Sequence, residues 1–133
     1  MMEVTPEETV VGFVGIGVMG KSMVSNLMNS GYQVIISTRT KARAEDLLEH
    51  GAQWKDTPGE VAQASNLVIT MVGYPSDVEE VYFGDDGILA NADKGSIVVD
   101  MTTSSPVLAT RIYQEGKQKG IQVMDAPVSG GDV

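Results

Sequence analysis

The alternation of short apolar runs with longer amphipathic stretches constrains the fold of this chain more than any other feature. Runs such as Leu-Val-Ile-Thr-Met at 67–71 are apolar nearly throughout rather than at every second residue. Strands of this kind are typical of a parallel sheet whose two faces are both covered by helices. Strands that alternate with helices favour βαβ units with right-handed crossovers. The sequence therefore predicts an α/β fold with an open, doubly wound, mostly parallel sheet, whose strands are 10–14, 33–37, 53–54, 67–71, 96–100 and 121–125.

Capping residues and glycines indicate where the helices begin and end. The segment Thr57-Pro58-Gly59-Glu60 combines a threonine N-cap, a proline at the first helical position and a glutamate three residues after the cap. Ser76, with Glu79 three residues later, repeats this pattern. In the first helix, Met23, Leu27 and Met28 have the spacing of one buried face. The predicted helices are 21–30, 40–50, one that starts at 58, 77–83 and 106–119, with Gly31, Gly51 and Gly120 as C-terminal stops.

Length and composition narrow the class of protein. The chain has 133 residues, 42% of them hydrophobic and 20% charged, which is typical of one globular domain. It has no cysteine, so neither a disulfide framework nor a thiolate metal site is available. A net charge of −9 disfavours nucleic acid as a partner, and no apolar run reaches the length of a membrane helix. We expect an acidic N-terminal extension at 1–9, one domain at 10–133, and a cytoplasmic location, with an organellar matrix as the alternative.

A glycine-rich hexapeptide follows the first predicted strand directly. It reads Gly-Ile-Gly-Val-Met-Gly and matches the pattern G-x-G-x-x-G. The first glycine permits a sharp turn, the second leaves room for a pyrophosphate, and the third lets the helix pack close to the strand. A plain strand-to-helix turn is the alternative, but the strand before it and the helix after it favour a dinucleotide site in a Rossmann-type fold. The candidate residues are Gly15, Ile16, Gly17, Val18, Met19 and Gly20.

The residues after the second predicted strand bear on which dinucleotide is bound. NAD sites usually carry an acidic residue there for the ribose 2′-hydroxyl, but the first carboxylate here is Glu45. Arg39 offers a planar donor fork that suits a phosphate dianion, and an anion would also offset the unfavourable placement of cations at a helix start. We therefore predict NADP as the cofactor, with NAD as the alternative. The candidate phosphate-binding residues are Thr38, Arg39, Thr40 and Arg43.

Four segments together resemble the β-hydroxyacid dehydrogenase family. They are Phe-Val-Gly-Ile-Gly-Val-Met-Gly at 13–20, Thr-Arg-Thr at 38–40, Asp-Met-Thr-Thr-Ser-Ser-Pro at 100–106 and Asp-Ala-Pro-Val-Ser-Gly-Gly at 125–131. The family includes 3-hydroxyisobutyrate dehydrogenase, tartronate semialdehyde reductase and glyoxylate reductases, with 6-phosphogluconate dehydrogenase more distant. The resemblance extends from about residue 10 to Val133.

The resemblance also implies roles for residues outside the glycine turn. Val72, Gly73 and Asp77 would lie along the ribose, although Val72-Gly73 replaces the leucine-proline that relatives often have. Thr102 or Thr103 would lie near the nicotinamide. The last segment would bind the carboxylate and hydroxyl of the substrate, in part through consecutive amides that form an anion nest. Its candidate residues are Ser129, Gly130 and Gly131.

The implied reaction is hydride transfer between NADP(H) and a 3-hydroxy acid or its semialdehyde. The catalytic lysine of the family lies beyond Val133, in a helical C-terminal domain that this chain lacks, so we expect no catalytic residue here. The chain is predicted to bind NADP(H) without turnover, and its full-length relatives are expected to be homo-oligomers. His50, Lys117 and Lys119 are expected at the surface. The alternatives are a non-enzymatic nucleotide-binding or interaction module and a methyltransferase, which generally has an acidic residue after the second strand.

Overall fold

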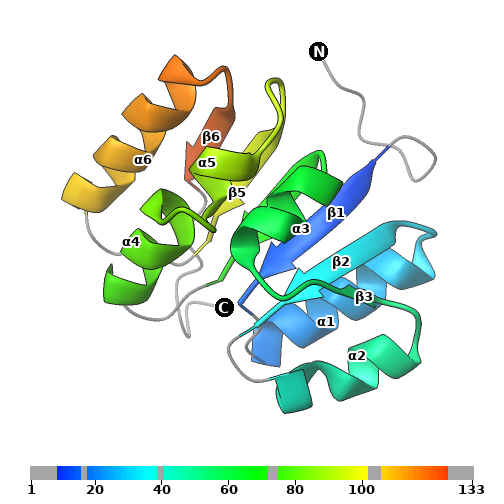
Figure 1. The fold of residues 1–133 in the computed structure, drawn as a ribbon. Helices are drawn as coiled ribbons and strands as arrows, with labels where there is room; N and C mark the ends of the chain where they lie inside the picture. The colour runs from blue at the N-terminus through cyan, green and yellow to red at the C-terminus, as the bar shows by residue number, and fades with distance from the viewer. Residues whose placement is uncertain (1–8, 16–17, 39–40, 72–74, 102–105, 126–133) are drawn as a thin grey trace.

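The protein is a six-stranded, wholly parallel sheet with helices on both faces (Figure 1). The computed structural model describes residues 9–15, 18–38, 41–71, 75–101 and 106–125. The strand order is β3-β2-β1-β4-β5-β6, which confirms the predicted doubly wound topology. The strands are β1 Val10–Val14, β2 Gln33–Ser37, β3 Gln53–Trp54, β4 Leu67–Thr70, β5 Ile97–Asp100 and β6 Gln122–Asp125.

Each face of the sheet has its own helices and its own hydrophobic core cluster. The cluster on one face contains Val24 of α1 and Leu47 of α2, while that on the other contains Val61 of α3, Tyr82 of α4 and Ile112 of α6. This division follows from right-handed crossovers, since the chain winds outward from β1 in one direction and then in the other. The helices are α1 Val18–Asn29, α2 Glu45–Glu49, α3 Pro58–Ala64, α4 Pro75–Phe83, α5 Ile88–Asn91 and α6 Pro106–Gln118, with a 3₁₀ turn, η1, at Lys41–Ala44.

Alternate residues of the inner strands enter the two clusters. In β2, Ile35 packs against α3 and its neighbours, whereas Val34 and Ile36 pack on the face of α1. Because successive side chains of a strand point to opposite faces, a sheet covered on both sides needs apolar residues at every position. Gly12 lets α3 pack close to β1, since an added Cβ would lie 2.5 Å from both Ser65 Oγ and Val61 Cγ1.

The predicted capping signals are confirmed at three helix ends and at one helix start. Thr57 Oγ1 accepts a hydrogen bond from the Glu60 amide at 3.1 Å and donates to Glu60 Oε1 at 3.3 Å, so Thr57 is the N-cap of α3 as predicted. Gly31, Gly51 and Gly120 all adopt positive φ angles just past a helix. A left-handed residue there lets the chain turn back and bond the last free carbonyls, as the amide of Tyr32 does with Leu27 O at 3.0 Å.

Several predicted helix details were wrong. The helix predicted at 40–50 is split into η1 and α2, and α5 was not anticipated. Helix α4 begins at Pro75, so Ser76 lies inside it rather than at its N-cap, because proline suits the first helical position. The predicted face of α1 is confirmed, since Met23, Leu27 and Met28 pack against the core, although they are partly buried and the fully buried side chain is Val24.

Candidate functional site

The carboxyl ends of five parallel strands meet in one row, which we call the terminal row. The register pairs Val14 with both Ser37 and Thr70, Thr70 with Asp100, and Asp100 with Asp125. Every segment that the sequence analysis proposed as a site follows a member of this row. Five chain segments therefore leave the sheet at the same end, the carboxyl end of its strands, although they are separated by up to about a hundred residues in sequence.

Backbone hydrogen bonds continue past the strand ends and hold the row together. The Gly15 amide donates to Ser37 O at 2.9 Å, the Met71 amide to Val14 O at 2.9 Å, and the Met101 amide to Thr70 O at 3.0 Å. These bonds link the carboxyl ends of β2, β1, β4 and β5 directly to one another. They fix where each following segment leaves the sheet.

The strand order reverses between β1 and β4, and the glycine turn lies at this reversal. In open α/β sheets, ligands bind outside the carboxyl ends of the strands at such a switch point. Gly15 adopts a φ of 78°, a left-handed conformation that favours glycine, as expected for the first glycine of the turn. Gly20 is buried in the first turns of α1, which agrees with close helix packing at the third glycine. Ile16 and Gly17 lie outside the described residues, as do the side chains of Val18 and Met19.

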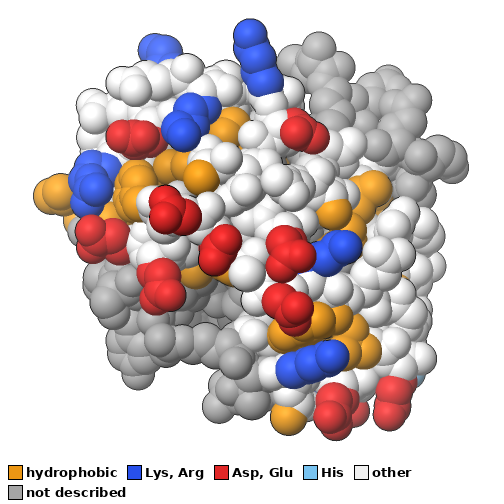
Figure 2. Space-filling model, viewed as in Figure 1, with side chains coloured by type: hydrophobic (Ala, Val, Ile, Leu, Met, Phe, Trp, Pro, Cys, Tyr) orange, Lys and Arg blue, Asp and Glu red, His pale blue; other side chains and the backbone are white. Residues whose placement is uncertain are grey.

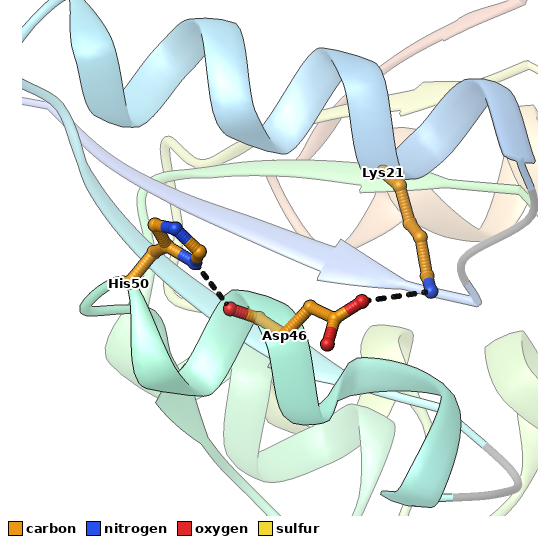
Figure 3. A network of polar contacts seen from close by, with 3 residues as sticks. All are labelled: Lys21, Asp46 and His50. Atoms are coloured by element: carbon orange, nitrogen blue, oxygen red, sulfur yellow. Dashed lines mark hydrogen bonds and ion pairs between the residues drawn. The ribbon is translucent and has the colours of Figure 1, made fainter.

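The end of β2 is surrounded by exposed polar contacts. The Lys41 ammonium lies 5.4 Å from the centre of the Trp54 ring, and Lys21 Nζ lies 3.8 Å from Asp46 Oδ2. His50 is exposed, as predicted, and its Nδ1 donates to the carbonyl of Asp46 at 2.6 Å (Figure 3). The Lys21 ion pair connects α1 with α2, whereas the His50 contact lies within the C-terminal end of α2.

Thr38 is half-buried directly after β2. Arg39, Thr40 and the side chain of Arg43 lie outside the described part of the chain. The predicted contact of these residues with an adenosine phosphate therefore stays a prediction.

The ends of β4 and β5 are joined instead by a buried polar network. Thr70 Oγ1 lies 2.6 Å from the Tyr82 hydroxyl and donates to Asp100 Oδ1 at 3.2 Å. All three side chains are at most 2% exposed. The sequence analysis did not single out Thr70 or Tyr82, because the helix residue and the strand residue are twelve positions apart and no local pattern connects them.

The charges are distributed unevenly between the two sides of the molecule. Residues 21–55 hold five of the nine lysines and arginines, whereas residues 56–93 hold none of them and eight of the eighteen acidic residues. Figure 2 shows acidic side chains gathered over the face covered by α3, α4 and α5. An anionic ligand is therefore repelled from that face and attracted toward the end of β2.

The remaining candidate residues fall into two groups. Lys117 and Lys119 are exposed, as predicted. Asp77 lies in α4, but its side chain is not described. The other predicted ribose, nicotinamide and substrate residues lie outside the described residues, namely Val72, Gly73, Thr102, Thr103, Ser129, Gly130 and Gly131.

The described residues contain neither a cluster of metal ligands nor a helix able to cross a membrane. No group of three histidine or acidic side chains there could hold a metal ion. None of the described helices combines the length and apolar character that crossing a membrane requires.

Comparison with known proteins places this site in a family. Residues 10–133 match the family described as the NAD binding domain of 6-phosphogluconate dehydrogenase. The chain is 54% identical over 123 residues to an uncharacterized oxidoreductase of Bacillus subtilis, YkwC, covering 92% of this chain and 43% of that protein. The chain therefore spans about two-fifths of the length of this curated relative.

Solved structures agree with the sequence match. A 3-hydroxyisobutyrate dehydrogenase of Mycobacterium tuberculosis with L-serine has a TM-score of 0.83 and 29% identity, over 92% of this chain and 41% of that one. An imine reductase of Myxococcus stipitatus in complex with NADP+ has a TM-score of 0.80 and 26% identity, over 91% of this chain and 41% of that one. The chain belongs to the family of the NAD binding domain of 6-phosphogluconate dehydrogenase, and its expected kinship with 3-hydroxyisobutyrate dehydrogenases is confirmed.

Proposed function

We propose that this chain binds NADP(H) as the cofactor-binding part of an oxidoreductase that acts on a 3-hydroxy acid or its semialdehyde. The observation that carries the proposal is the terminal row, because the strands that precede the glycine turn, the Thr-Arg-Thr segment and the other three candidate segments all end there in register. Family membership and the NADP+ complex of the related imine reductase support the same assignment.

The glycine turn suits the pyrophosphate of a dinucleotide. Gly15 has the backbone conformation of a sharp turn, Gly20 is buried, and α1 starts at Val18 beside the switch point. The amides at a helix start have no partners within the helix and attract phosphate oxygens. Gly15 to Gly20 would hold the pyrophosphate there, and the bound nicotinamide would supply the hydride chemistry.

The choice of NADP over NAD depends on the residues after β2. Arg39, with Thr38, Thr40 and Arg43, would bind the 2′-phosphate of the adenosine. The acidic residue nearest after this strand, Glu45, is exposed in α2. An arginine fork gives a phosphate dianion paired, charge-assisted hydrogen bonds, whereas an acidic residue would repel it.

The other segments would orient the reacting groups. Val72, Gly73 and Asp77 would follow the ribose, Thr102 and Thr103 would lie near the nicotinamide, and Ser129, Gly130 and Gly131 would bind the substrate carboxylate and hydroxyl. The chain's contribution would be to bind and align these groups, which lowers the entropic cost of reaching the transition state. No described residue is assigned as the general acid or base, because His50, Lys117 and Lys119 are all exposed. We expect NADP(H) binding without dehydrogenase turnover by this chain.

Calorimetric titration of the chain with NADPH and with NADH tests the cofactor assignment. We expect tighter binding of NADPH, and we expect Arg39→Asp to weaken it by roughly 10- to 100-fold, the loss that follows from a charge-assisted pair worth about 1.5 to 3 kcal/mol. Lys94→Asp makes the same change of charge in the exposed turn before β5 and should leave the preference intact. Equal affinities for the two cofactors in the wild-type chain, unchanged in Arg39→Asp, would contradict the assignment.

A further inference from the structure

Three buried polar side chains connect the ends of β4 and β5 with α4. Thr70 Oγ1 lies 2.6 Å from the hydroxyl of Tyr82 and 3.2 Å from Asp100 Oδ1. Thr70 and Tyr82 are fully buried, and Asp100 is 2% exposed. Among the acidic residues whose side chains the structure describes, Asp100 is the one that is buried. We refer to Thr70, Tyr82 and Asp100 as the buried trio.

The hydrogen bonds of the buried trio link two hydroxyls to one carboxylate. Thr70 Oγ1 donates to Asp100 Oδ1 at 3.2 Å, and either hydroxyl can be the donor in the 2.6 Å contact between Thr70 and Tyr82. When Thr70 donates its one proton to Asp100, Tyr82 is the donor to Thr70. Each bond of such a chain polarises the next in a site shielded from water.

The location of the buried trio suggests more than a role in folding. Thr70 and Asp100 are neighbours in the terminal row, and the Met101 amide donates to Thr70 O at 3.0 Å. The segments that we propose for the ribose and nicotinamide begin two residues after Thr70 and two residues after Asp100. Tyr82 belongs to α4, the helix into which the first of these segments leads. A single hydrogen-bond network thus joins the ends of β4 and β5, after which these two segments begin, to α4.

The adenosine side of the site lies two strands away from β4 in the sheet. The Thr-Arg-Thr segment follows β2, which is separated from β4 by β1 in the sheet. A change in the spacing of β4, β5 and α4 should therefore affect the nicotinamide half of the cofactor and spare the adenosine half.

We propose that the buried trio is a positioning unit for the nicotinamide half of the cofactor, an inference that rests on the proposed function. Its three side chains come from the carboxyl ends of β4 and β5 and from α4, and they would act through the segments that follow the two strands. Its hydroxyl-to-carboxylate chain sets the separation of the two strand ends and the approach of α4. Small displacements of residues that do not themselves touch the reacting atoms can alter the alignment of bound groups.

The test compares two ligands with the 133-residue chain and its Tyr82→Phe variant, which loses one hydroxyl and keeps the ring. The ligands are NADPH and adenosine 2′,5′-bisphosphate, which is the adenosine half alone. We expect Tyr82→Phe to weaken NADPH binding about five- to tenfold, as the loss of one buried hydrogen bond would. Binding of the bisphosphate should change by less than about twofold, since the end of β2 is untouched.

Two controls separate positioning from general destabilisation. Tyr113→Phe removes the same hydroxyl from a tyrosine of α6 that is 52% exposed and should change neither affinity. Ile88→Val loosens the same core cluster while leaving the three polar side chains of the buried trio unchanged, and it should also change neither affinity. If Tyr82→Phe weakens both ligands equally, or weakens neither, the inference is wrong. If the wild-type chain binds neither ligand, the proposed function itself is wrong. If the wild-type chain binds both ligands and Tyr82→Phe binds them equally well, only the inference is wrong.

If Tyr82→Phe does not fold, hydrogen exchange in the wild-type chain tests the inference instead. The amides of Met71 and Met101 bond to Val14 O and Thr70 O, next to the buried trio. We expect NADPH to slow hydrogen exchange at both amides, whereas adenosine 2′,5′-bisphosphate leaves them unchanged. Equal exchange rates with the two ligands would overturn the inference.

Discussion

The two sides of the terminal row hold their polar groups in opposite ways. Beside β2 and β3, Lys41 lies over Trp54, and the side chains of the Lys21–Asp46 pair are 43% and 79% exposed. At the ends of β4 and β5, the buried trio is almost entirely shielded from water. Exposed charges remain hydrated and contribute little to folding, whereas buried hydrogen-bonded groups are costly to disturb. Substitutions on the side that would recognise the adenosine phosphate should therefore cost little stability, whereas substitutions in the buried trio between β4 and β5 should cost much more.

The largest effect is expected where the buried hydroxyl chain is cut. Thr70→Val removes the acceptor of the Tyr82 proton and a donor to Asp100, both in the interior. We expect the free energy of unfolding to fall by about 2 to 4 kcal/mol, the cost of leaving two buried polar groups without this partner. Urea denaturation measures the change. Thr70→Ser, which keeps the hydroxyl, serves as the control. If Thr70→Val lowers the free energy of unfolding no more than Thr70→Ser does, the contrast between the two sides is wrong.

A buried hydroxyl without a partner should behave in the opposite sense. Ser65 Oγ is buried next to Gly12 and has no hydrogen-bond partner among the described residues. Ser65→Ala is expected to raise the free energy of unfolding by about 1 kcal/mol, because the unpaired hydroxyl no longer has to be desolvated. Thermal denaturation reports the shift, with Thr57→Ala as the matched control. The Thr57 hydroxyl caps α3 and is satisfied, so its removal should lower stability by about 1 kcal/mol.

The smallest effect is expected at the exposed pair beside β2. A double-mutant cycle with Lys21→Ala and Asp46→Ala should give a coupling free energy of roughly 0.2 to 1 kcal/mol, because water and salt screen the two charges. Chemical denaturation at low and high salt measures this coupling, which should shrink at high salt. A coupling free energy as large as the loss of stability in Thr70→Val would show that the polar groups of the two sides contribute equally to stability.

Much of the fold could be predicted from local signals. The strands β1, β2 and β3 begin and end where the apolar runs predicted, and the Thr57 side chain caps α3 as its sequence pattern implied. These signals succeed because they depend on residues within a few positions of one another. The glycine turn is of the same kind, since the conformation of Gly15 depends mainly on the absence of a side chain.

The missed elements depend on contacts that are distant in sequence. Helix α5 has four residues, too few for a periodic pattern, and its Asn91 Oδ1 accepts a hydrogen bond at 3.3 Å from Gln63 Nε2 of α3, 28 positions away. Its packing against α3 is equally non-local, since an added Cβ at Gly59 would lie 2.4 Å from Asn91 Nδ2. The predicted face of α1 does pack on the core, but only the packing against the sheet shows that Val24 is its fully buried residue.

By itself, the sequence determined the order of strands and helices, the glycine turn after β1 and the family to which the chain belongs. These properties reside in short stretches, where backbone sterics and hydrogen bonding act between near neighbours. Only the tertiary structure decided the register that aligns Ser37, Val14, Thr70, Asp100 and Asp125, and only it brought Tyr82 of α4 to Thr70 and Asp100. The reason is physical: strand pairing and helix packing join residues twelve to sixty positions apart, and burial from water then makes their hydrogen bonds specific.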